Sequence, residues 1–451
     1  MVAGSWSGVG KTTVATGLMA ALRRRGTRVA AAKVGPDFID PGYHALATGR
    51  PGRNLDPWMC GDETVVALAA WGARDSDLLI VEGVMGLFDG AGTTSVSSTA
   101  HVATLLQAPA VLVVDAAAMS SSVAAVVHGF ATIDAGVTVS GVVLNRVGSD
   151  RHEALLRAAL EPLDIPVLGT LRRDDQLAWR DRHLGLVPVV EHPAEVAAAL
   201  DRLADAIAAQ VDLDLVCRLA QRAPRLAVAE PPTAAPGGRC RIAVAGGPAF
   251  SFGYPDNLEL LAQAGAELVP FDPTRDPVLP EGVGGLIAGG GFPEVFAAAL
   301  ADNKPLLADT RARVEKGLVV WAECGGLLWL GRQLDGHRLC GVVNADGRMT
   351  DRLTLGYRTA TFRQATPLGP ADTVVRGHEF HYSSLEPPGE ALALVGSSGH
   401  AMGGHAAVGG WASPTMLASY LHIHLGGAPH LATQLVRTIT QAAEGSGQET
   451  A

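Results

Sequence analysis

The start of the chain carries a glycine-rich segment of the kind that binds phosphate, Gly4-Ser5-Trp6-Ser7-Gly8-Val9-Gly10-Lys11-Thr12-Thr13. It ends as a P-loop does, but its first glycine lies one residue earlier than the pattern Gly-x-x-x-x-Gly-Lys-Ser/Thr requires. Backbone N–H groups, a lysine ammonium and a helix N-terminus all attract phosphate. The alternative is a glycine-rich turn with an exposed lysine. The residues that we expect to bind a nucleotide are Gly8, Val9, Gly10, Lys11, Thr12 and Thr13.

Acidic and basic residues in the same half suit a metal-nucleotide site. Glu82 follows directly after the apolar run Leu79-Ile80-Val81, which predicts a strand. In P-loop folds, a carboxylate at the end of a strand is a common ligand of Mg²⁺. We therefore predict Thr12 and Glu82 as Mg²⁺ ligands; the alternative for Glu82 is an ordinary paired carboxylate. The residues predicted to orient substrate or Mg²⁺ are Lys33, Asp37, Asp40, Asp89, Arg50 and Arg53. The arginines suit carboxylates, which guanidinium binds bidentately, although solvated loop charges are the alternative.

A cysteine in the second half has the surroundings of a nucleophile, Trp321-Ala322-Glu323-Cys324-Gly325-Gly326. The apolar run predicts a buried strand, and the glycines allow a sharp turn that presents the sulfur at a helix start, where thiolate is favoured. We expect His422 to act as the base, and backbone N–H groups near Gly290 and Gly325 to hold an oxyanion. The alternative is a cysteine that serves as a small buried hydrophobe.

The first half alternates short apolar runs with helical spacing. The predicted strands are Val29–Ala32, Leu78–Val81, Val111–Val114 and Val139–Leu144, and the predicted helices are Thr12–Arg25, Met119–Ile133, Arg151–Leu160 and Ala194–Leu219. Strands that alternate with helices indicate an α/β fold with a doubly wound parallel sheet. Ligands bind at the carboxyl ends of the strands in such a sheet, which is where the P-loop and Glu82 would lie.

The pattern restarts after a stretch rich in Pro, Ala and Gly. We therefore expect a domain over residues 1–220, a linker over 221–239 and a second α/β domain over 240–451. In the second domain we predict strands at Arg241–Ala245, Glu267–Phe271, Leu286–Ala288 and Leu318–Ala322, a helix at Asn257–Ala264, and β structure at Thr359–Gln364, Thr373–Arg376 and His400–Gly409.

Composition limits the classes of function. The 451 residues include 35 Lys and Arg against 45 Asp and Glu, and 48% are hydrophobic, which excludes a disordered chain and argues against a general nucleic-acid binder. The five cysteines form no CxxC pair. No secretory signal or membrane span is evident, so we expect a cytoplasmic protein without nucleic-acid or membrane partners. A homodimer is left open.

Together these segments resemble one family, the cobyrinic or hydrogenobyrinic acid a,c-diamide synthases of corrin biosynthesis. The long block Lys33–Trp58 is the most specific, whereas the P-loop alone would be a weak signal. The resemblance covers nearly the whole chain. The matching segments are Gly4–Thr13, Lys33–Trp58, Glu82–Gly90, Gly289–Glu294, Ala322–Leu330, Arg376–Ser383 and Ser419–His424.

The resemblance implies a dethiobiotin-synthetase-like P-loop domain followed by a class I glutamine amidotransferase domain. It implies that Cys324 is the glutaminase nucleophile and that His422 activates it. ATP and L-glutamine would be co-substrates with Mg²⁺ as cofactor, and two acetate carboxylates of a tetrapyrrole would become amides.

The chain departs from the family pattern at two places. Many class I glutaminases carry His-x-Glu, but His424 stands at the third position, so a Cys–His dyad is implied, or a third member from elsewhere. Relatives carry an Arg/Lys-Asp pair where this chain has Gly246-Gly247-Pro248. A metal pair formed by His422 and His424 is a further alternative, although no third ligand is evident.

Three other functions share some of these features. A nickel-sirohydrochlorin a,c-diamide synthase would use the same residues on another tetrapyrrole. A regulatory or partitioning P-loop ATPase would explain the P-loop but not Cys324. A redox-sensing protein would explain Cys324 alone.

Overall fold

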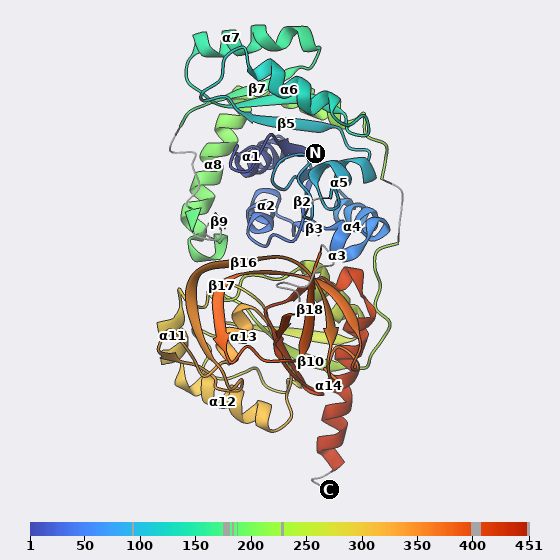
Figure 1. Cartoon of the computed structure of the whole chain (residues 1–451), viewed down its shortest axis with the longest axis vertical. Coiled ribbons are helices and arrows are strands. Elements are labelled where there is room, and N and C mark those ends of the chain that lie inside the picture. The colour runs from blue at the N-terminus through green and yellow to red at the C-terminus, as the bar shows by residue number, and fades with distance from the viewer. Residues whose placement is uncertain are drawn as a thin grey trace. The chain divides into compact units, whose positions relative to one another are not determined.

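The computed structural model describes residues 1–92, 94–174, 181–182, 185–186, 188–226, 230–397 and 407–448. The chain divides into two compact units, Met1–Pro231 and Pro232–Ala451. Figure 1 shows the helices and strands of both.

The first unit is built on a seven-stranded sheet whose strands all pair parallel. In spatial order the strands are β3 (Arg53–Leu55), β2 (Val29–Val34), β4 (Leu78–Glu82), β1 (Val2–Gly4), β5 (Ala110–Asp115), β6 (Val139–Val147) and β7 (Val167–Arg172). The main helices are α1 (Lys11–Arg24), α2 (Asp40–Thr48), α4 (Asp62–Ala73), α5 (Thr99–Leu105), α6 (Val123–Thr132), α7 (Asp150–Leu160), α8 (Pro193–Gln210) and α9 (Leu213–Ala220).

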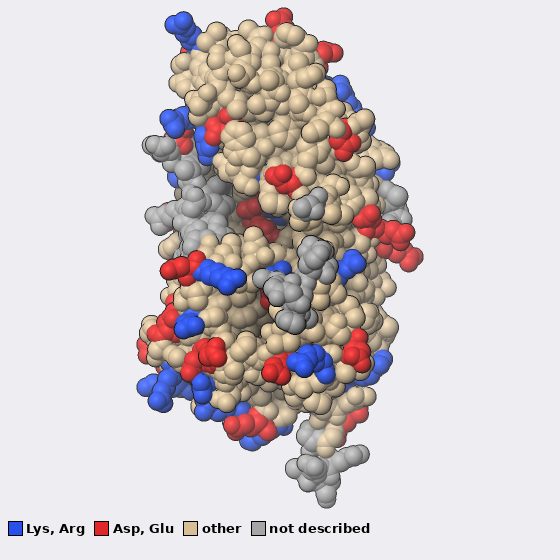
Figure 2. Space-filling model, viewed as in Figure 1, with Lys and Arg blue, Asp and Glu red and all other residues tan. Residues whose placement is uncertain are grey.

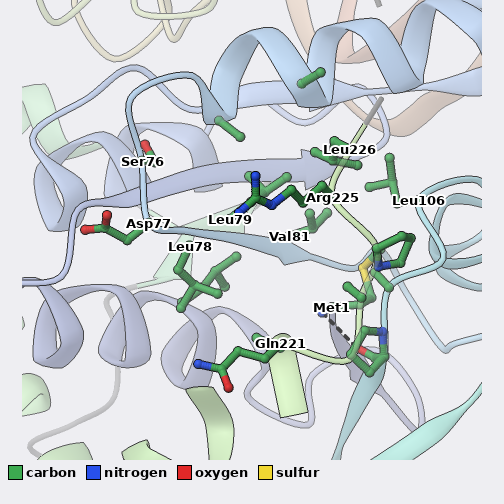
Figure 3. A pocket seen from close by; sticks show the side chains of 18 of the residues that line it. Met1, Ser76, Asp77, Leu78, Leu79, Val81, Leu106, Gln221, Arg225 and Leu226 are labelled. Carbon is green, nitrogen blue, oxygen red and sulfur yellow. Dashed lines mark hydrogen bonds between the residues drawn. The ribbon is translucent and has the colours of Figure 1, made fainter. Parts of the chain in front are cut away.

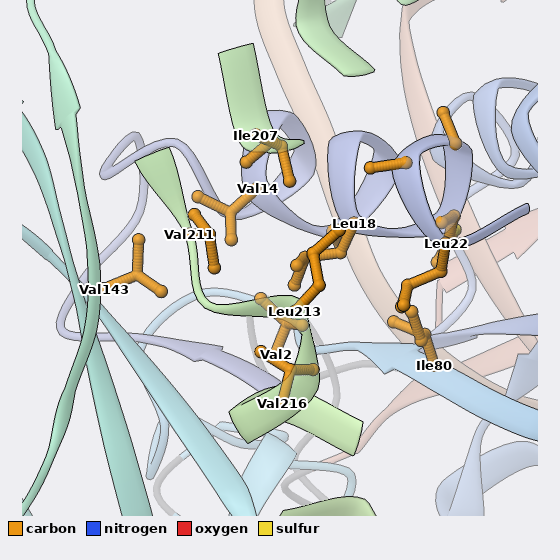
Figure 4. Close-up of a cluster of buried hydrophobic side chains, with 14 of the residues drawn as sticks. Val2, Val14, Leu18, Leu22, Ile80, Val143, Ile207, Val211, Leu213 and Val216 are labelled. Carbon is orange, nitrogen blue, oxygen red and sulfur yellow. The ribbon is translucent and has the colours of Figure 1, made fainter. Parts of the chain in front are cut away.

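Alternate side chains of the central strand β5 enter two different cores, as the two-residue period of a strand requires. Val111 and Val113 of β5 belong to the core formed with α1, α8 and α9, part of which Figure 4 shows. Leu112 and Val114 belong to the core formed with α5, α6 and α7. Helices therefore cover both faces, which confirms the predicted doubly wound fold and its four predicted strands.

The short elements differ from the prediction. Strands β1 and β3 have three residues each, too few for the apolar runs that we searched for, and β7 also escaped prediction. The single helix predicted over Ala194–Leu219 is two helices, because the chain is extended at Val211, whose backbone bridges Gly169.

The second unit has a six-stranded sheet with the order β11 (Ala266–Phe271), β10 (Cys240–Ala245), β12 (Gly285–Ala288), β13 (Val319–Glu323), β21 (Met416–Ser419) and β20 (Trp411–Ser413). The strands pair parallel except for β20, which is antiparallel to β21. Helices α10 (Pro255–Gln263) and α14 (His430–Gln448) share a core on one face, and α11 (Ala297–Asp302), α12 (Lys304–Glu315) and α13 (Gly325–Leu330) share a core on the other.

A second, mainly antiparallel sheet is built around β16 (Asp346–Phe362) and β17 (Val374–Glu386). Its other strands are β14 (Gln333–Leu334), β15 (His337–Arg338), β18 (Leu392–Gly396), β19 (Ala407–Gly409) and β22 (His422–Ile423). These strands confirm the β structure predicted around Thr359–Gln364 and Thr373–Arg376. Of the segment predicted at His400–Gly409, the structure describes only the part in β19; residues 400–406 lie outside the described residues.

The boundary between the units falls inside the predicted linker, residues 221–239. Ala234 is buried in the second unit, and the Thr433 hydroxyl donates to the Ala235 carbonyl at 2.8 Å. The Gly237 amide donates to the Ala264 carbonyl at 2.8 Å. These contacts attach the later part of the stretch to the second unit.

The surface carries charges of both signs. On the face shown in Figure 2, Lys and Arg side chains lie interspersed with Asp and Glu side chains. Within the described ranges, no helix combines the length and the apolar composition that a membrane span needs.

Candidate functional site

The P-loop connects β1 to α1 at the carboxyl end of the first unit's sheet. Gly8 and Gly10 have φ angles of 79° and 93°, a left-handed conformation that favours glycine. A Cβ on Gly4 would lie 2.8 Å from Cδ of Lys11 and 2.9 Å from a methyl group of Val9. The Lys11 and Val9 side chains therefore pack so closely against position 4 that any larger residue would have to displace them.

Glu82 lies fully buried at the end of β4 and joins three other side chains. Its Oε1 accepts a hydrogen bond from the Thr12 hydroxyl at 2.6 Å and lies 2.9 Å from Nζ of Lys33. Its Oε2 lies 2.6 Å from Nε2 of His44. Asp40, at the start of α2, lies 2.6 Å from Nζ of Lys33 and 3.4 Å from the Thr12 hydroxyl. The structure therefore brings four of the predicted residues together and adds His44.

The charges in this network depend on one another. Burial alone would lower the pKa of Lys33, but the carboxylates of Asp40 and Glu82 raise it above its ordinary value. Burial and then repulsion from Glu82 raise the pKa of Asp40. Burial also opposes ionisation of Glu82, yet Lys33 and hydrogen bonds from His44 and Thr12 lower its pKa. Lys33 and Glu82 thus form a buried ion pair, and Asp40 is the group most easily neutralised.

Lys11, the P-loop lysine, is in a different electrostatic position. Its Nζ donates to the Trp6 carbonyl at 3.2 Å. Burial, and then repulsion from Lys33, lower the pKa of Lys11 to about 8, while nearby carboxylates oppose that shift. The hydrogen bond to a neutral carbonyl leaves the ammonium charge for a phosphate to neutralise.

The donor set suits Mg²⁺. This ion prefers oxygen ligands and takes one or two carboxylates, with the rest from phosphates and water. Asp40 and Glu82 supply carboxylate oxygens within 3.4 Å and 2.6 Å of the Thr12 hydroxyl. Across the part of the chain that the structure describes, no three His, Cys, Asp or Glu side chains gather as a metal-ligand group. Two carboxylates and a hydroxyl therefore fit an ion that shares its coordination with a nucleotide.

The other predicted residues lie around this network. Asp37 accepts hydrogen bonds from the amides of Ile39 and Asp40, so it shapes the entry to α2. Asp89 accepts a hydrogen bond from the Gly86 amide at 2.8 Å.

The two predicted arginines lie against α4. Arg50 donates to the carbonyl of Arg74 at 2.7 Å. Arg53 is buried, and a Cβ on Gly72 of α4 would lie 2.8 Å from its Cγ. The structure therefore places both side chains beside α4.

Two residues at the end of β6 that were not predicted as site residues hold the P-loop. Asn145 donates to the Val9 carbonyl at 2.8 Å, and Arg146 donates to the Gly8 carbonyl at 3.1 Å. Arg146 also forms an ion pair with Asp115 of β5. No motif spacing links residue 145 to the loop; the only signal is a polar pair at the carboxyl end of a predicted strand.

A large cavity of the first unit lies away from this chemistry. It has a volume of about 1020 Å³ and is lined by the amino ends of the central strands, including Met1, Leu78 and Leu79 (Figure 3). Glu82 and the P-loop lie at the opposite, carboxyl ends. The cavity is mostly apolar, so it offers little for phosphate or carboxylate.

The second site is the turn from β13 into α13. Cys324 has φ of 46° and ψ of −99°, a conformation that costs energy in a non-glycine residue and is typical of functional turns. A Cβ on Gly326 would lie 2.0 Å from the Ala288 carbonyl oxygen, so the turn needs glycine there. Cys324 is only 6% exposed. The expectation that the turn presents the sulfur rather than burying it is therefore wrong, because the cysteine is buried.

His422 of β22 reaches this turn. Its Nδ1 lies 3.3 Å from Oε2 of Glu323, and the amide of Ile423 donates to Oε1 of Glu323 at 3.0 Å. Burial opposes protonation of His422, but hydrogen bonds to Cys324 and Glu323 raise its pKa to about 10. The structure thus unites Cys324 and His422 and adds Glu323, to which sequence analysis gave no role.

The two predicted oxyanion glycines lie at the same point. A Cβ on Gly290 would lie 2.7 Å from Cε1 of His422. A Cβ on Gly325 would lie 3.3 Å from the carbonyl carbon of Gly290. Backbone from two different strand ends therefore borders the imidazole beside Cys324, as an oxyanion site for acyl transfer requires.

His424 belongs to a separate group of side chains. Its ring packs on Tyr254 with centroids 4.6 Å apart, and its Nε2 lies 3.6 Å from Oδ2 of Asp256. Its Nδ1 accepts a hydrogen bond from the Gly426 amide at 3.1 Å. These contacts indicate a structural role for His424 beside the start of α10. They do not support the alternative that His422 and His424 bind a metal together.

Comparisons with known proteins identify the type of domain in each unit. A CobQ/CobB/MinD/ParA nucleotide binding domain matches residues 1–186, and a CobB/CobQ-like glutamine amidotransferase domain matches residues 241–429. Hydrogenobyrinate a,c-diamide synthase of Streptomyces coelicolor is 47% identical, over 97% of this chain and 96% of its own. Cobyrinate a,c-diamide synthase of a Synechococcus strain is 43% identical, over 98% of each chain. The chain belongs to the a,c-diamide synthase family.

Membership of the a,c-diamide synthase family confirms the predicted family, fold class and enzyme class. The chain is an amide-forming ligase with a glutamine amidotransferase domain, and its two domain types imply the use of ATP and glutamine. The roles of individual residues and the use of Mg²⁺ remain predictions.

Proposed function

We propose that the chain converts the a and c acetate carboxylates of hydrogenobyrinic or cobyrinic acid to amides, using ATP and ammonia from glutamine. One combination supports this proposal: a Cys324–His422 pair and a Thr12–Lys33–Glu82 network occur in a chain that matches hydrogenobyrinate a,c-diamide synthase over 97% of its length. Residues 1–220 would form the ligase half and residues 240–451 the glutaminase half. We expect the enzyme to act in the cytoplasm; a homodimer stays a prediction.

In the glutaminase half, Cys324 attacks the amide carbon of glutamine as a thiolate. His422 donates a proton to the nitrogen, so that ammonia leaves and a thioester forms. Backbone N–H groups near Gly290 and Gly325 stabilise the oxyanion. His422 then takes a proton from water, and the resulting hydroxide attacks the thioester carbon. Glutamate leaves after its new carboxyl group loses a proton to solvent, and the Cys324 thiolate is restored beside the protonated His422.

In the ligase half, a substrate carboxylate attacks the terminal phosphorus of ATP, ADP leaves, and an acyl phosphate forms. Ammonia displaces phosphate to give the amide, and two rounds produce the diamide. The P-loop amides and Lys11 hold the phosphates, while Lys33 adds a second positive charge close to the nucleotide. Mg²⁺, held by Thr12 and Glu82 with Asp40 beside them, would screen the phosphate charges. Asp37 would position Asp40, and Asp89, Arg50 and Arg53 remain candidates for orienting substrate.

The deciding experiment is an amidation assay with MgATP and glutamine on hydrogenobyrinic acid, cobyrinic acid and nickel-sirohydrochlorin. Mass spectrometry would show the replacement of two acid groups by amides. We expect diamide from one or both corrin acids and none from nickel-sirohydrochlorin. Amidation of nickel-sirohydrochlorin alone would mean that the substrate is this tetrapyrrole and not a corrin acid. No amidation of any acceptor, with ATP hydrolysis intact, would contradict the proposal.

A further inference from the structure

The residue that orients His422 is missing from the position where many glutaminases carry it. In the pattern His-x-Glu the acid follows two residues after the histidine, and here His424 stands there. His424 packs on Tyr254 near Asp256. A buried imidazole that must donate a proton in one step and accept one in the next needs a partner that fixes its tautomer.

Glu323, the residue immediately before the nucleophile, makes the contacts that such an acid would make. Its two carboxylate oxygens engage consecutive residues of β22: Oε2 lies 3.3 Å from Nδ1 of His422, and Oε1 accepts the Ile423 amide at 3.0 Å. Glu323 and His422 are 8% and 1% exposed, so water competes little for this contact. The hydrogen bond to the Ile423 amide fixes the carboxylate itself.

We propose that Glu323 is the positioning acid of the glutaminase, holding Nδ1 of His422 so that Nε2 faces the thiol of Cys324. This inference rests on the proposed function of Cys324 and His422. The acid that other glutaminases take from the histidine strand would here come from the nucleophile strand β13.

The turn at Cys324 makes this arrangement possible. In a regular strand consecutive side chains point to opposite faces, so Glu323 and Cys324 would diverge. The positive φ angle of Cys324, the residue after Glu323, breaks that alternation. Both side chains can therefore reach a single imidazole, and the strained turn serves the base as well as the nucleophile.

The other titratable groups that face His422 come from β17. His378 lies opposite His422 in the strand register, and burial, followed by the charge of His422, lowers its pKa to about 3. Burial lowers the pKa of His381 to about 4, so both of these histidines are neutral near pH 7. Glu379 forms a buried ion pair with Arg358 at 2.7 Å, which balances its charge. Glu323 is thus the carboxylate whose charge is directed at His422.

The test uses the full chain with three variants, Glu323→Gln, Glu323→Asp and Asp256→Asn. Glutamine hydrolysis would be followed from pH 6 to 9.5, and the rate at which iodoacetamide alkylates Cys324 would be measured over the same range. Circular dichroism and thermal unfolding of each full-length variant report whether it is folded, because ammonia-dependent amidation needs only the ligase half, which lies in the other unit. Asp256→Asn is the matched control, because it removes a different buried carboxylate, the one beside His424.

For Glu323→Gln we expect kcat for glutamine hydrolysis to fall about 100-fold with KM changed less than threefold. Without the carboxylate, the imidazolium is less stable, so alkylation of Cys324 should slow about tenfold at pH 7 and its pH profile should move to higher pH. Glu323→Asp should restore part of both effects, and Asp256→Asn should leave the alkylation profile in place.

Two results would overturn the inference: a wild-type alkylation profile in Glu323→Gln, or a shifted profile in Asp256→Asn with none in Glu323→Gln. If Glu323→Gln does not fold, the folded Glu323→Asp variant decides, and a wild-type alkylation profile in that variant contradicts the inference. A wild-type chain that does not hydrolyse glutamine would instead defeat the proposed function itself.

Discussion

Two buried lysines in the first unit show how contacts decide the charge of a side chain. Lys33 lies between the carboxylates of Asp40 and Glu82, which raise its pKa. Lys11 donates to a backbone carbonyl, and burial and repulsion from Lys33 lower its pKa to about 8. Lys33 therefore keeps its charge at any physiological pH, whereas Lys11 becomes neutral in the mildly alkaline range.

This difference predicts a pH dependence for nucleotide binding. In the free protein the Lys11 ammonium is present below about pH 8 and is lost as the pH rises through that value. The Kd for MgATP, measured by titration calorimetry, should rise above pH 8 with a limiting slope of about tenfold per pH unit. Lys11→Arg is the control, because guanidinium stays charged; it should bind more weakly but without this rise. A Kd that is constant from pH 7 to 9.5 in the wild type would contradict the prediction.

Site residues that belong to sequence motifs could be predicted, whereas those that folding brings together from distant positions could not. The sequence was enough to predict four residues of the nucleotide site, because each lies in the P-loop, at the end of a predicted strand or in the loop after one. These residues are Thr12, Lys33, Asp40 and Glu82. The role of Glu323 could not be predicted, because its spatial neighbour His422 is separated from it by 99 residues along the chain. Asn145 could not be predicted for the same reason, because 136 residues separate it along the chain from Val9, its partner in the P-loop.

At the scale of elements, the position of α1 depends on a single small residue. Gly17 lies in the middle of α1, where it faces α8, and a Cβ there would lie 2.6 Å from Cγ1 of Ile207 and 2.9 Å from Cγ of Leu203. Both atoms are bonded directly to Cβ and so lie close to the backbone of α8, where neither can easily move aside. Since α1 begins at Lys11, the contact between α1 and α8 also supports the P-loop.

The same substitution should therefore have opposite effects in two helices. Gly17→Ala should destabilise the fold by about 1–3 kcal/mol through overpacking against α8. Gly129→Ala in α6, where the added methyl group meets open space, should stabilise by about 0.5–1 kcal/mol because alanine favours helix. Thermal unfolding of the two full-length variants, compared with the wild type, measures both effects. A neutral or stabilising Gly17→Ala would show that α8 can move away at little cost.

The long helices and strands could be predicted from hydrophobic periodicity, whereas the short ones could not. Strand β5 was evident as an apolar run because both of its faces are buried. Strand β1 has three residues, one of them Gly4, and the break between α8 and α9 at Val211 carries no Pro or Gly. In these cases, tertiary contacts rather than local preference determine where the element begins or ends.

At the scale of the whole molecule, the proposed function divides two reactions between two units with separate cores. Cys324→Ser should abolish glutamine-dependent amidation but keep synthesis from added ammonia, because the ligase residues lie in the other unit. Conversely, the Lys11→Ala variant should lose amidation with either glutamine or added ammonia, but it should still hydrolyse glutamine. Loss of ammonia-dependent synthesis in a folded Cys324→Ser variant would contradict this division.

Mixing the two variants then tests how ammonia reaches the acyl phosphate. In the mixture, Lys11→Ala can release ammonia only into solution, where water dilutes it and protonates most of it at neutral pH, so that it loses the lone pair needed for attack. We therefore expect the mixture to make diamide far more slowly than the wild type at pH 7, and faster as the pH or the protein concentration rises. The wild-type rate per molecule should not depend on protein concentration, because ammonia released and used within one molecule is not diluted. A mixture that matches the wild type at pH 7 and at low protein concentration would mean that ammonia passes through bulk solution, and that joining both reactions in one chain gives no kinetic advantage.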